Sequence, residues 1–131
     1  KNLFTYSRIK DKYFGYNAAN KLYSHWIKKS ILGQYDDCCL VIPDNEKLIN
    51  GFVTLKKINN LIKIGLFGIN KYSQYKGHSS KLLQSINHYM EEKKVTKSIV
   101  TTQKDNIPAN KIYLKDGHKF KETNVWLYLK K

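Results

Sequence analysis

Apolar side chains recur at two different periods along this chain, and the order of these periods limits the folds open to it. A spacing of three and four residues, which marks one face of a helix, covers residues 17–32 and 82–93. Apolar runs at 38–42, 48–56 and 62–69 have the length of strands and are separated by residues typical of turns. Helices and strands therefore alternate, and we expect them to share one core.

The second half of the chain continues this alternation. A short strand is expected at 98–102, followed by a helix that Asn106 caps, with Pro108 in the first turn, where a missing amide donor costs little. Two more strands are expected at 118–122 and 125–129. The predicted fold class is α/β, with a mixed, largely antiparallel sheet flanked by helices.

Length and charge narrow the class of protein further. At 131 residues the chain is expected to form one domain, 1–131. Its formal charge of +14 comes from 23 lysines and a single arginine, Arg8, spread along the chain without forming a block. Such a surface favours an anionic partner, which could be a nucleic acid, a phospholipid or a small molecule that carries phosphate. The charge alone does not choose among them.

Signals for membranes, export and metals are absent from the sequence. No apolar stretch approaches the roughly 20 residues that span a bilayer, and there is no signal-peptide pattern. Cys38 and Cys39 are adjacent, so their side chains would point to opposite faces of a strand, and we expect reduced thiols and a cytoplasmic location. No spacing of cysteine and histidine suits zinc. Neither a metal nor a membrane partner is therefore expected.

A loop that contains glycine precedes the second long helix. It runs QYKGHSSKLL from Gln74 to Leu83, with Gly77 in the loop and two serines at the start of the helix. The first amides of a helix have no partner within it and lie at the positive end of its dipole, so phosphate binds well there. The lysines of the segment would add charge. From these residues alone, a glycine turn before a serine-capped helix is the simpler alternative.

The helix after Asn106 carries a tyrosine near its far end. Gly117 ends this helix, so Tyr113 lies close to two turns after the cap and roughly on the same face. A phenol with a pKa of about 10 stays protonated at neutral pH, yet it can share its proton with a departing thiolate whose thiol has a pKa of about 8.5. Tyr113 is therefore a candidate acid. A ring that only packs in the core is the alternative.

Together these segments resemble the GNAT acyl-CoA N-acyltransferases. The similarity rests on Gln-x-x-Gly-x-Ser in the loop 74–79, which follows the strand at 62–69, and on Asn-x-x-Ala-x-x-x-Tyr at 106–113. It implies an acetyl-CoA-dependent N-acetyltransferase, in which that strand pairs with the pantetheine arm and the loop grips the pyrophosphate. It also implies that the first strand of the fold, and any N-terminal domain, lies before Lys1.

The resemblance assigns roles to individual residues. Tyr113 is implied to be the catalytic acid, Arg8 to bind the acceptor substrate, and the amides around 67–69 to meet the oxyanion. The acetyl-CoA-binding residues that it implies are Phe67, Gly68, Ile69, Gln74, Tyr75, Lys76, Gly77, His78, Ser79, Ser80, Asn106 and Ala109. No general base is identified, because the four histidines are scattered, and water can take that role. No cofactor besides acetyl-CoA is implied.

Within this family the chain is most similar to the branch that acetylates dTDP-4-amino-4,6-dideoxygalactose, the dTDP-fucosamine acetyltransferases. The acceptor implied is a nucleotide-linked deoxy-amino-sugar of polysaccharide biosynthesis. Two positions depart from the family pattern, because Ser79 stands where glycine or alanine is usual and His118 where phenylalanine is common. The residues that carry this similarity are Ser7-Arg8-Ile9, Trp26, Gly33, Asp36, Cys39-Leu40, Gly51, Ile64-Gly65-Leu66, Thr102-Gln103, Asn106, Ala109, Tyr113, Gly117, Thr123 and Trp126-Leu127-Tyr128.

Other functions stay open from the sequence. The acceptor could instead be a protein or peptide amine or another small amine, although the positive charge disfavours polyamines. A basic module that binds nucleic acid is a second reading, but arginine is nearly absent and no nucleic-acid motif is found, so no nucleic-acid partner is expected. A third is a domain that binds acyl-CoA without turnover. Related folds often pair through their C-terminal strands, which suggests a homodimer.

Overall fold

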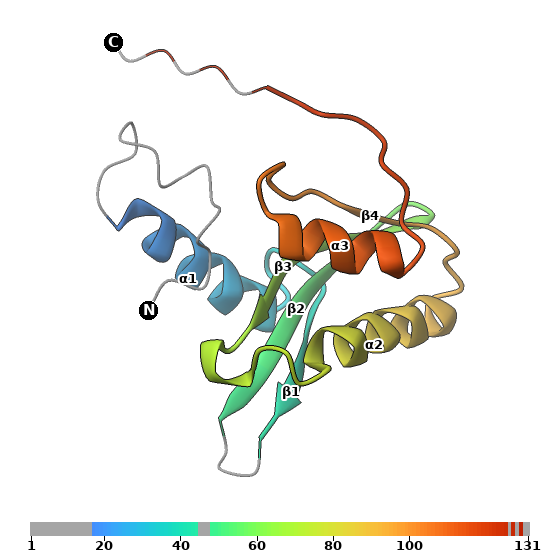
Figure 1. The fold of residues 1–131 in the computed structure, drawn as a ribbon. Helices are drawn as coiled ribbons and strands as arrows, with labels where there is room; N and C mark the ends of the chain where they lie inside the picture. The colour runs from blue at the N-terminus through green and yellow to red at the C-terminus, as the bar shows by residue number, and fades with distance from the viewer. Residues whose placement is uncertain (1–16, 45–47, 126, 128, 130–131) are drawn as a thin grey trace.

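The computed structural model describes residues 17–44, 48–125, 127 and 129. Its elements alternate in the predicted order as far as the last helix, and Figure 1 shows them along the chain. The elements are α1 (Ala18–Ile31), β1 (Cys38–Pro43), β2 (Ile49–Ile58), β3 (Leu61–Ile69), the short 3₁₀ helix η2 (Lys71–Ser73), α2 (His78–Glu92), β4 (Ser98–Val100) and α3 (Ile107–Lys115).

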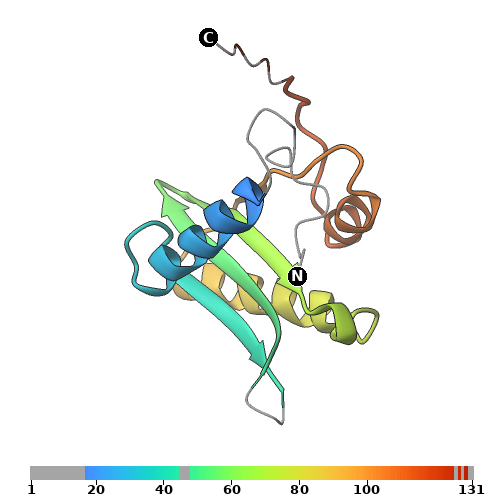
Figure 2. The same ribbon diagram turned by 90° about the vertical axis from the view of Figure 1, so that its left-hand side faces the viewer.

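The strands form one sheet in the order β1-β2-β3-β4. The first three are antiparallel neighbours, and β4 pairs with β3 in parallel. Helices α1 and α2 lie on opposite faces of this sheet, which is seen most easily when Figures 1 and 2 are compared. The predicted α/β class and the largely antiparallel sheet are confirmed. The predicted β1–β2 hairpin is confirmed as well, although residues 45–47 of the loop that connects its strands lie outside the described part.

The core lies between the sheet and α2. This helix buries Leu82, Leu83, Ile86 and Met90 at the helical spacing that the sequence shows, and they meet buried side chains of β2 and β3. Burying one such side chain stabilises the fold by roughly 1.5–3 kcal/mol, so this face holds the helix firmly. Tyr113 of α3 belongs to the same cluster. The core therefore ties the candidate acid to the central strands.

A β-bulge interrupts the pairing of β2 with β3. Val53 faces Phe67, but Leu55 faces Ile64, so Gly65 and Leu66 together stand opposite Thr54 alone. The Leu66 N–H donates to Thr54 Oγ1 at 2.8 Å, which satisfies the amide that the bulge displaces. The bulge therefore includes a glycine within the strand, Gly65.

A buried carboxylate fastens α1 to the sheet beside this bulge. Asp36 is only 3% exposed, and its Oδ2 accepts hydrogen bonds from Trp26 Nε1 at 2.6 Å and from Ser30 Oγ at 3.1 Å. Both donors lie on α1. Buried polar groups of this kind are costly unless they are paired, so the three side chains hold one another in place.

Gly65→Ala should destabilise the protein by about 1–3 kcal/mol, because a Cβ at this position overpacks the bulge. It would lie 2.6 Å from Thr54 Oγ1 and 2.7 Å from Asp36 Oδ2. Urea denaturation of the two proteins measures the difference. Gly33→Ala is the comparison: its Cβ would meet nothing within 4 Å, so only its φ of +65° costs stability, by about 1 kcal/mol. An unchanged urea midpoint for Gly65→Ala would show that the bulge adapts to a methyl group.

The first of the two predicted C-terminal strands is wrong. Residues 118–125 have no regular secondary structure. The other described residues of the second predicted strand, Leu127 and Leu129, have none either, and residues 126 and 128 lie outside the description. The apolar side chains of this segment, Phe120, Val125, Leu127 and Leu129, are 77–91% exposed. Alternating apolar residues favour a strand only where a neighbouring edge is available, and this segment leaves the sheet (Figure 1).

Neither a membrane-spanning helix nor a metal-binding cluster is found among the described residues. Among the helices described, none is long and apolar enough to cross a membrane. The same part of the chain holds no group of three or more His, Cys, Asp or Glu side chains that could bind a metal ion. Cys38 and Cys39 are free thiols, each partly buried, and burial raises the pKa of both.

Candidate functional site

The second half of β3 has one edge without a strand partner in the described structure. β4 pairs only with Ile62–Ile64, so no strand of the described residues covers the edge from the bulge onward. On the other edge, the N–H groups of Leu66 and Asn70 donate to Thr54 Oγ1 and to the Asn50 carbonyl. Because N–H groups alternate along a strand, those of Phe67 and Ile69 point to the uncovered edge. Two of the predicted oxyanion amides thus lie on a free edge.

Tyr113 lies beside this edge. This residue is 7% exposed, and its ring meets the Phe67 ring at 5.9 Å between centroids, with an interplanar angle of 80°. It also meets the His118 ring, at 5.7 Å between centroids and 65° between the ring planes. Burial raises the pKa of the phenol above its usual value, so the hydroxyl stays protonated far beyond neutral pH. The structure therefore brings the candidate acid to the strand segment that carries the free amides.

The N-terminus of α2 offers backbone amides without helical partners. Gly77 precedes the helix with φ +77°, and no side chain caps the first turn. The first intrahelical bond runs from Lys81 N–H to the Gly77 carbonyl, so the amides of 78–80 have no carbonyl partner within the helix. A Cβ at Gly77 would meet nothing within 4 Å, and the first turn contains no acidic residue. This end of α2 is open and suited to an anion.

The predicted loop connects β3 to this helix end through η2. Gln74 follows η2 directly, and Gln74, Tyr75 and Lys76 are all exposed. Tyr75 has φ +62°, and with Gly77 it turns the chain into the helix. His78, expected in the loop, is the first residue of α2, and Ser79 and Ser80 lie in its first turn. All the predicted loop residues thus form one continuous segment that leads from the free edge to the helix end.

Asn106 caps α3, as predicted. Its Oδ1 accepts from the Ala109 N–H at 3.3 Å, and its Nδ2 donates to Thr102 Oγ1, also at 3.3 Å. Both polar groups of the Asn106 side chain therefore form hydrogen bonds with residues at or just before the start of α3. The contact of Asn106 and Ala109 with a pantetheine arm stays a prediction. Arg8, the predicted acceptor contact, lies outside the described residues.

One group of polar side chains beside Tyr113 was missed in the sequence. His118 Nε2 lies 3.0 Å from Ser98 Oγ, and its Nδ1 lies 3.3 Å from Asp116 Oδ2. Ser98 begins β4, whereas the other two residues follow α3. No spacing in the sequence indicates this contact, since it joins residues twenty positions apart. The only signal was that His118 replaces a phenylalanine common in the resembling family.

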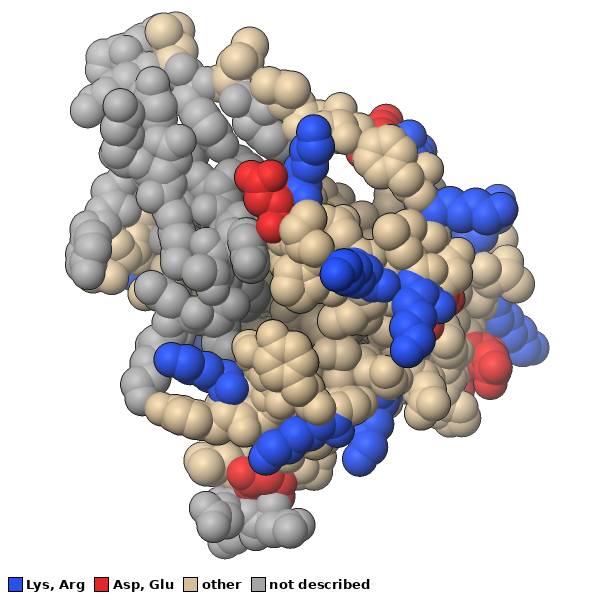
Figure 3. Space-filling model, viewed as in Figure 1, with Lys and Arg blue, Asp and Glu red and all other residues tan. Residues whose placement is uncertain are grey.

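Lysine side chains cover much of the surface around these elements. Figure 3 shows them distributed over the face that carries α2 and α3, with fewer acidic side chains between them. Lys76 and Lys81, which flank the start of α2, are both exposed. The site therefore lies in a positive environment that attracts anionic ligands.

Comparison with known proteins identifies the family of this chain. The sequence matches the acetyltransferase (GNAT) family model over residues 5–118. The chain belongs to the GNAT acetyltransferases. Enzymes of this family use acetyl-CoA as the acyl donor. The predicted assignment to the acetyltransferases is thus confirmed.

Individual GNAT proteins are similar to the chain as well. It is 28% identical over 126 residues to a dTDP-fucosamine acetyltransferase of Escherichia coli O6:H1. The aligned region covers 95% of this chain but 54% of that protein. The chain thus spans about half the length of this curated relative.

Two solved structures show the same fold. A putative acetyl transferase from Pyrococcus furiosus has a TM-score of 0.68 at 17% identity, over 88% of this chain and 82% of that one. The PaiA N-acetyltransferase from Thermoplasma acidophilum, solved in complex with coenzyme A, has a TM-score of 0.71 at 18% identity, over 88% and 74%. At these identities the likeness concerns the fold.

Proposed function

We propose that this GNAT domain transfers the acetyl group of acetyl-CoA to the amino group of a nucleotide-linked deoxy-amino-sugar such as dTDP-4-amino-4,6-dideoxygalactose, in polysaccharide biosynthesis. The observation that carries the proposal is the edge of β3 that has no strand partner among the described residues, to which the N–H groups of Phe67 and Ile69 point, while the Phe67 ring packs against Tyr113. The sugar is supported by the similarity to the dTDP-fucosamine acetyltransferase.

The residues of this chain suit acetyl-CoA at both ends of the site. Its pyrophosphate would bind at the start of α2, where the amides of 78–80 lack helical partners and no carboxylate opposes it. Lys76 and Lys81 would add charge. The pantetheine arm would extend along the uncovered edge of β3, whose amides can donate to it. Bound there, acetyl-CoA supplies the thioester that the amine attacks.

The roles of the protein groups in acetyl transfer follow from their chemistry. The N–H groups of Phe67 and Ile69 would stabilise the negative charge that develops on the carbonyl oxygen as the neutral amine attacks. Tyr113 would hold its proton until charge builds on the departing sulfur and then share it. No base is assigned, because a 4-amino group on a deoxy-sugar loses its proton more readily than lysine does, and water can accept it.

The positive surface favours an anionic acceptor. A nucleotide sugar carries a diphosphate, which the formal charge of +14 attracts, whereas a cationic polyamine would be repelled. Within the proposal Arg8 contacts the acceptor, since a guanidinium binds phosphate through two parallel hydrogen bonds.

A thermal-shift experiment tests the donor and the acceptor together. At a hundredfold excess over its Kd, acetyl-CoA should stabilise the protein by about 2.7 kcal/mol, or about 10 °C in Tm. The dTDP-amino-sugar should raise Tm further, and together the two should release free thiol. The same nucleotide sugar without its amino group is the control: it should bind without thiol release. Thiol release with a peptide amine or spermidine but not with the sugar would overturn the acceptor, and stabilisation by random oligonucleotides but not by acetyl-CoA would overturn the enzyme.

A further inference from the structure

The three polar side chains beside Tyr113 form a connected chain. Ser98 Oγ and His118 Nε2 are hydrogen-bonded at 3.0 Å, and Asp116 Oδ2 lies 3.3 Å from His118 Nδ1. The side chains of His118 and Asp116 are 18% and 19% exposed. Although Nδ1 is close to the carboxylate, the direction of the contact does not satisfy a hydrogen bond, and this buried nitrogen makes none with the described residues. The contact is therefore electrostatic.

The carboxylate selects the form of the imidazole ring. The negative charge of Asp116 Oδ2, 3.3 Å from Nδ1, favours the tautomer that carries its proton on Nδ1 over the one with a lone pair there. In the neutral ring Nε2 then accepts a hydrogen bond from the Ser98 hydroxyl. The ring is thus fixed from both sides, by the start of β4 and by the residue that follows α3.

The fixed ring contacts the candidate acid. Tyr113 makes edge contacts with both the His118 ring and the Phe67 ring, at 5.7 Å and 5.9 Å between centroids, so two neighbouring rings constrain the phenol. The backbone N–H of His118 also donates to the Tyr113 carbonyl at 3.0 Å, and this hydrogen bond closes the end of α3. We propose that Ser98, His118 and Asp116 form a clamp in which His118 is a positioning residue that orients Tyr113 for proton donation. The proposal rests on the proposed function, in which Tyr113 is the acid.

The same three residue types form the nucleophile, base and orienting group of hydrolases, but the geometry here favours a clamp. Ser98 belongs to a paired strand, in register with Ile62, and it is half-buried. A nucleophile needs an exposed turn and a hydrogen bond between base and carboxylate, and Asp116 does not make that bond.

Direct observation of the Tyr113 ring tests the clamp without relying on activity. With 3-fluorotyrosine at position 113, the ¹⁹F resonance should shift or broaden in Ser98→Ala. This substitution keeps the His118 side chain but removes the hydrogen bond that holds its ring. Ser98→Thr keeps the hydroxyl and should give the same ¹⁹F signal as the fluorinated protein with Ser98. An unchanged signal in Ser98→Ala would overturn the clamp.

Kinetics then test whether the clamp acts through the Tyr113 hydroxyl. His118→Ala should lower kcat at least about tenfold with an unchanged KM for acetyl-CoA, since small displacements of a reacting group cost this much. In a Tyr113→Phe background, the same change should cost less than about twofold, because the hydroxyl that it positions is already gone. Equal losses in both backgrounds would mean a general structural role and would overturn the proposal.

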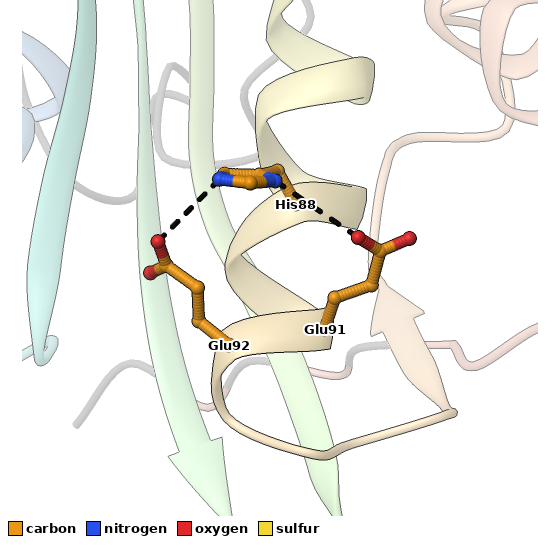
Figure 4. Close-up of polar contacts among 3 residues, drawn as sticks. All are labelled: His88, Glu91 and Glu92. Atoms are coloured by element: carbon orange, nitrogen blue, oxygen red, sulfur yellow. Dashed lines mark ion pairs between the residues drawn. The ribbon is translucent and has the colours of Figure 1, made fainter.

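The chain offers a matched histidine as control. His88 on α2 lies 3.9 Å from Glu91 and 3.5 Å from Glu92, and Figure 4 shows its ring between the two carboxylates. Its side chain is 74% exposed, so His88→Ala removes a histidine with carboxylate neighbours and should change neither kcat nor the ¹⁹F signal.

Two results would separate the clamp from the function on which it rests. If Tyr113→Phe leaves turnover unchanged, the acid assignment fails, and the ¹⁹F comparison alone decides whether the clamp holds the ring. Labelling of Ser98 by a fluorophosphonate probe would overturn the clamp in favour of a nucleophilic serine.

Discussion

Tyr113→Phe should lower kcat about a hundredfold or more while leaving the Kd of acetyl-CoA unchanged. The substitution removes one hydroxyl and keeps the ring that packs against Phe67 and His118. Donor binding would come instead from the amides of β3 and from the start of α2, which the change does not touch. The loss should therefore fall on the chemical step, where the leaving thiolate lacks its proton.

The measurement is thiol release under saturating acetyl-CoA, with the Kd taken from calorimetry. Tyr35→Phe is the matched control, since Tyr35 is half-exposed and contacts Trp26 and Lys56 away from the site. An unchanged kcat in Tyr113→Phe would remove this residue from the mechanism. A loss of donor binding in parallel with kcat would instead mean that the ring supports the site as a whole.

The pH profile gives a second reading of the same residue. A phenol is protonated below its pKa, and burial raises the pKa of Tyr113, so the acid form persists through the alkaline range. Over the same range the acceptor amine loses its proton and becomes a nucleophile. We therefore expect kcat/KM to rise with pH and then level off up to about pH 10. A fall between pH 8 and 9 would indicate a different acid.

The two long helices and the first three strands could be predicted because each carries its own apolar pattern. In α2 the predicted face is the one that is buried, yet the helix begins at His78, earlier than the apolar residues indicate. Its N-cap is Gly77 with positive φ, whereas the sequence offered the serines that follow as the usual signal. A boundary set by backbone geometry leaves no apolar signature.

The C-terminal strands could not be predicted correctly, because pairing depends on tertiary structure. β4 ends at Val100 instead of residue 102, since β3 changes register at the Gly65 bulge and no longer offers a straight edge. The segment after His118 has the alternation of a strand but is unpaired in the described residues. Local propensity here indicates what a segment could form if an edge were available.

The candidate site divides in the same way. The cap at Asn106 and the place of Tyr113 follow from spacing within one helix, so the sequence located them. The direction of the Phe67 and Ile69 amides depends on the bulge, which shifts the alternation by one residue, and no sequence pattern fixes that shift. The contact of His118 with Ser98 joins two elements and needs the folded chain.

Ser80→Glu should stabilise the protein and weaken acetyl-CoA binding at the same time. Ser80 is exposed in the first turn of α2, which has no acidic residue, so a carboxylate there interacts favourably with the helix dipole by about 0.3–1 kcal/mol. The same charge would repel the pyrophosphate. Two unit charges about 5 Å apart interact by about 3 kcal/mol at an effective dielectric of about 20, and solvent reduces this, so we expect a loss of affinity of about ten- to hundredfold.

Opposite signs in the two measurements distinguish an anion site from a merely capped helix. Gln84→Glu adds the same charge one turn later on the same helix, beyond the free amides, and should change the Kd of acetyl-CoA by less than about threefold. The loss in Ser80→Glu should shrink as salt is raised, because screening weakens the repulsion between exposed charges. If Ser80→Glu raised Tm and left the affinity unchanged at low salt, the diphosphate would bind elsewhere, and the open helix end would serve only the fold.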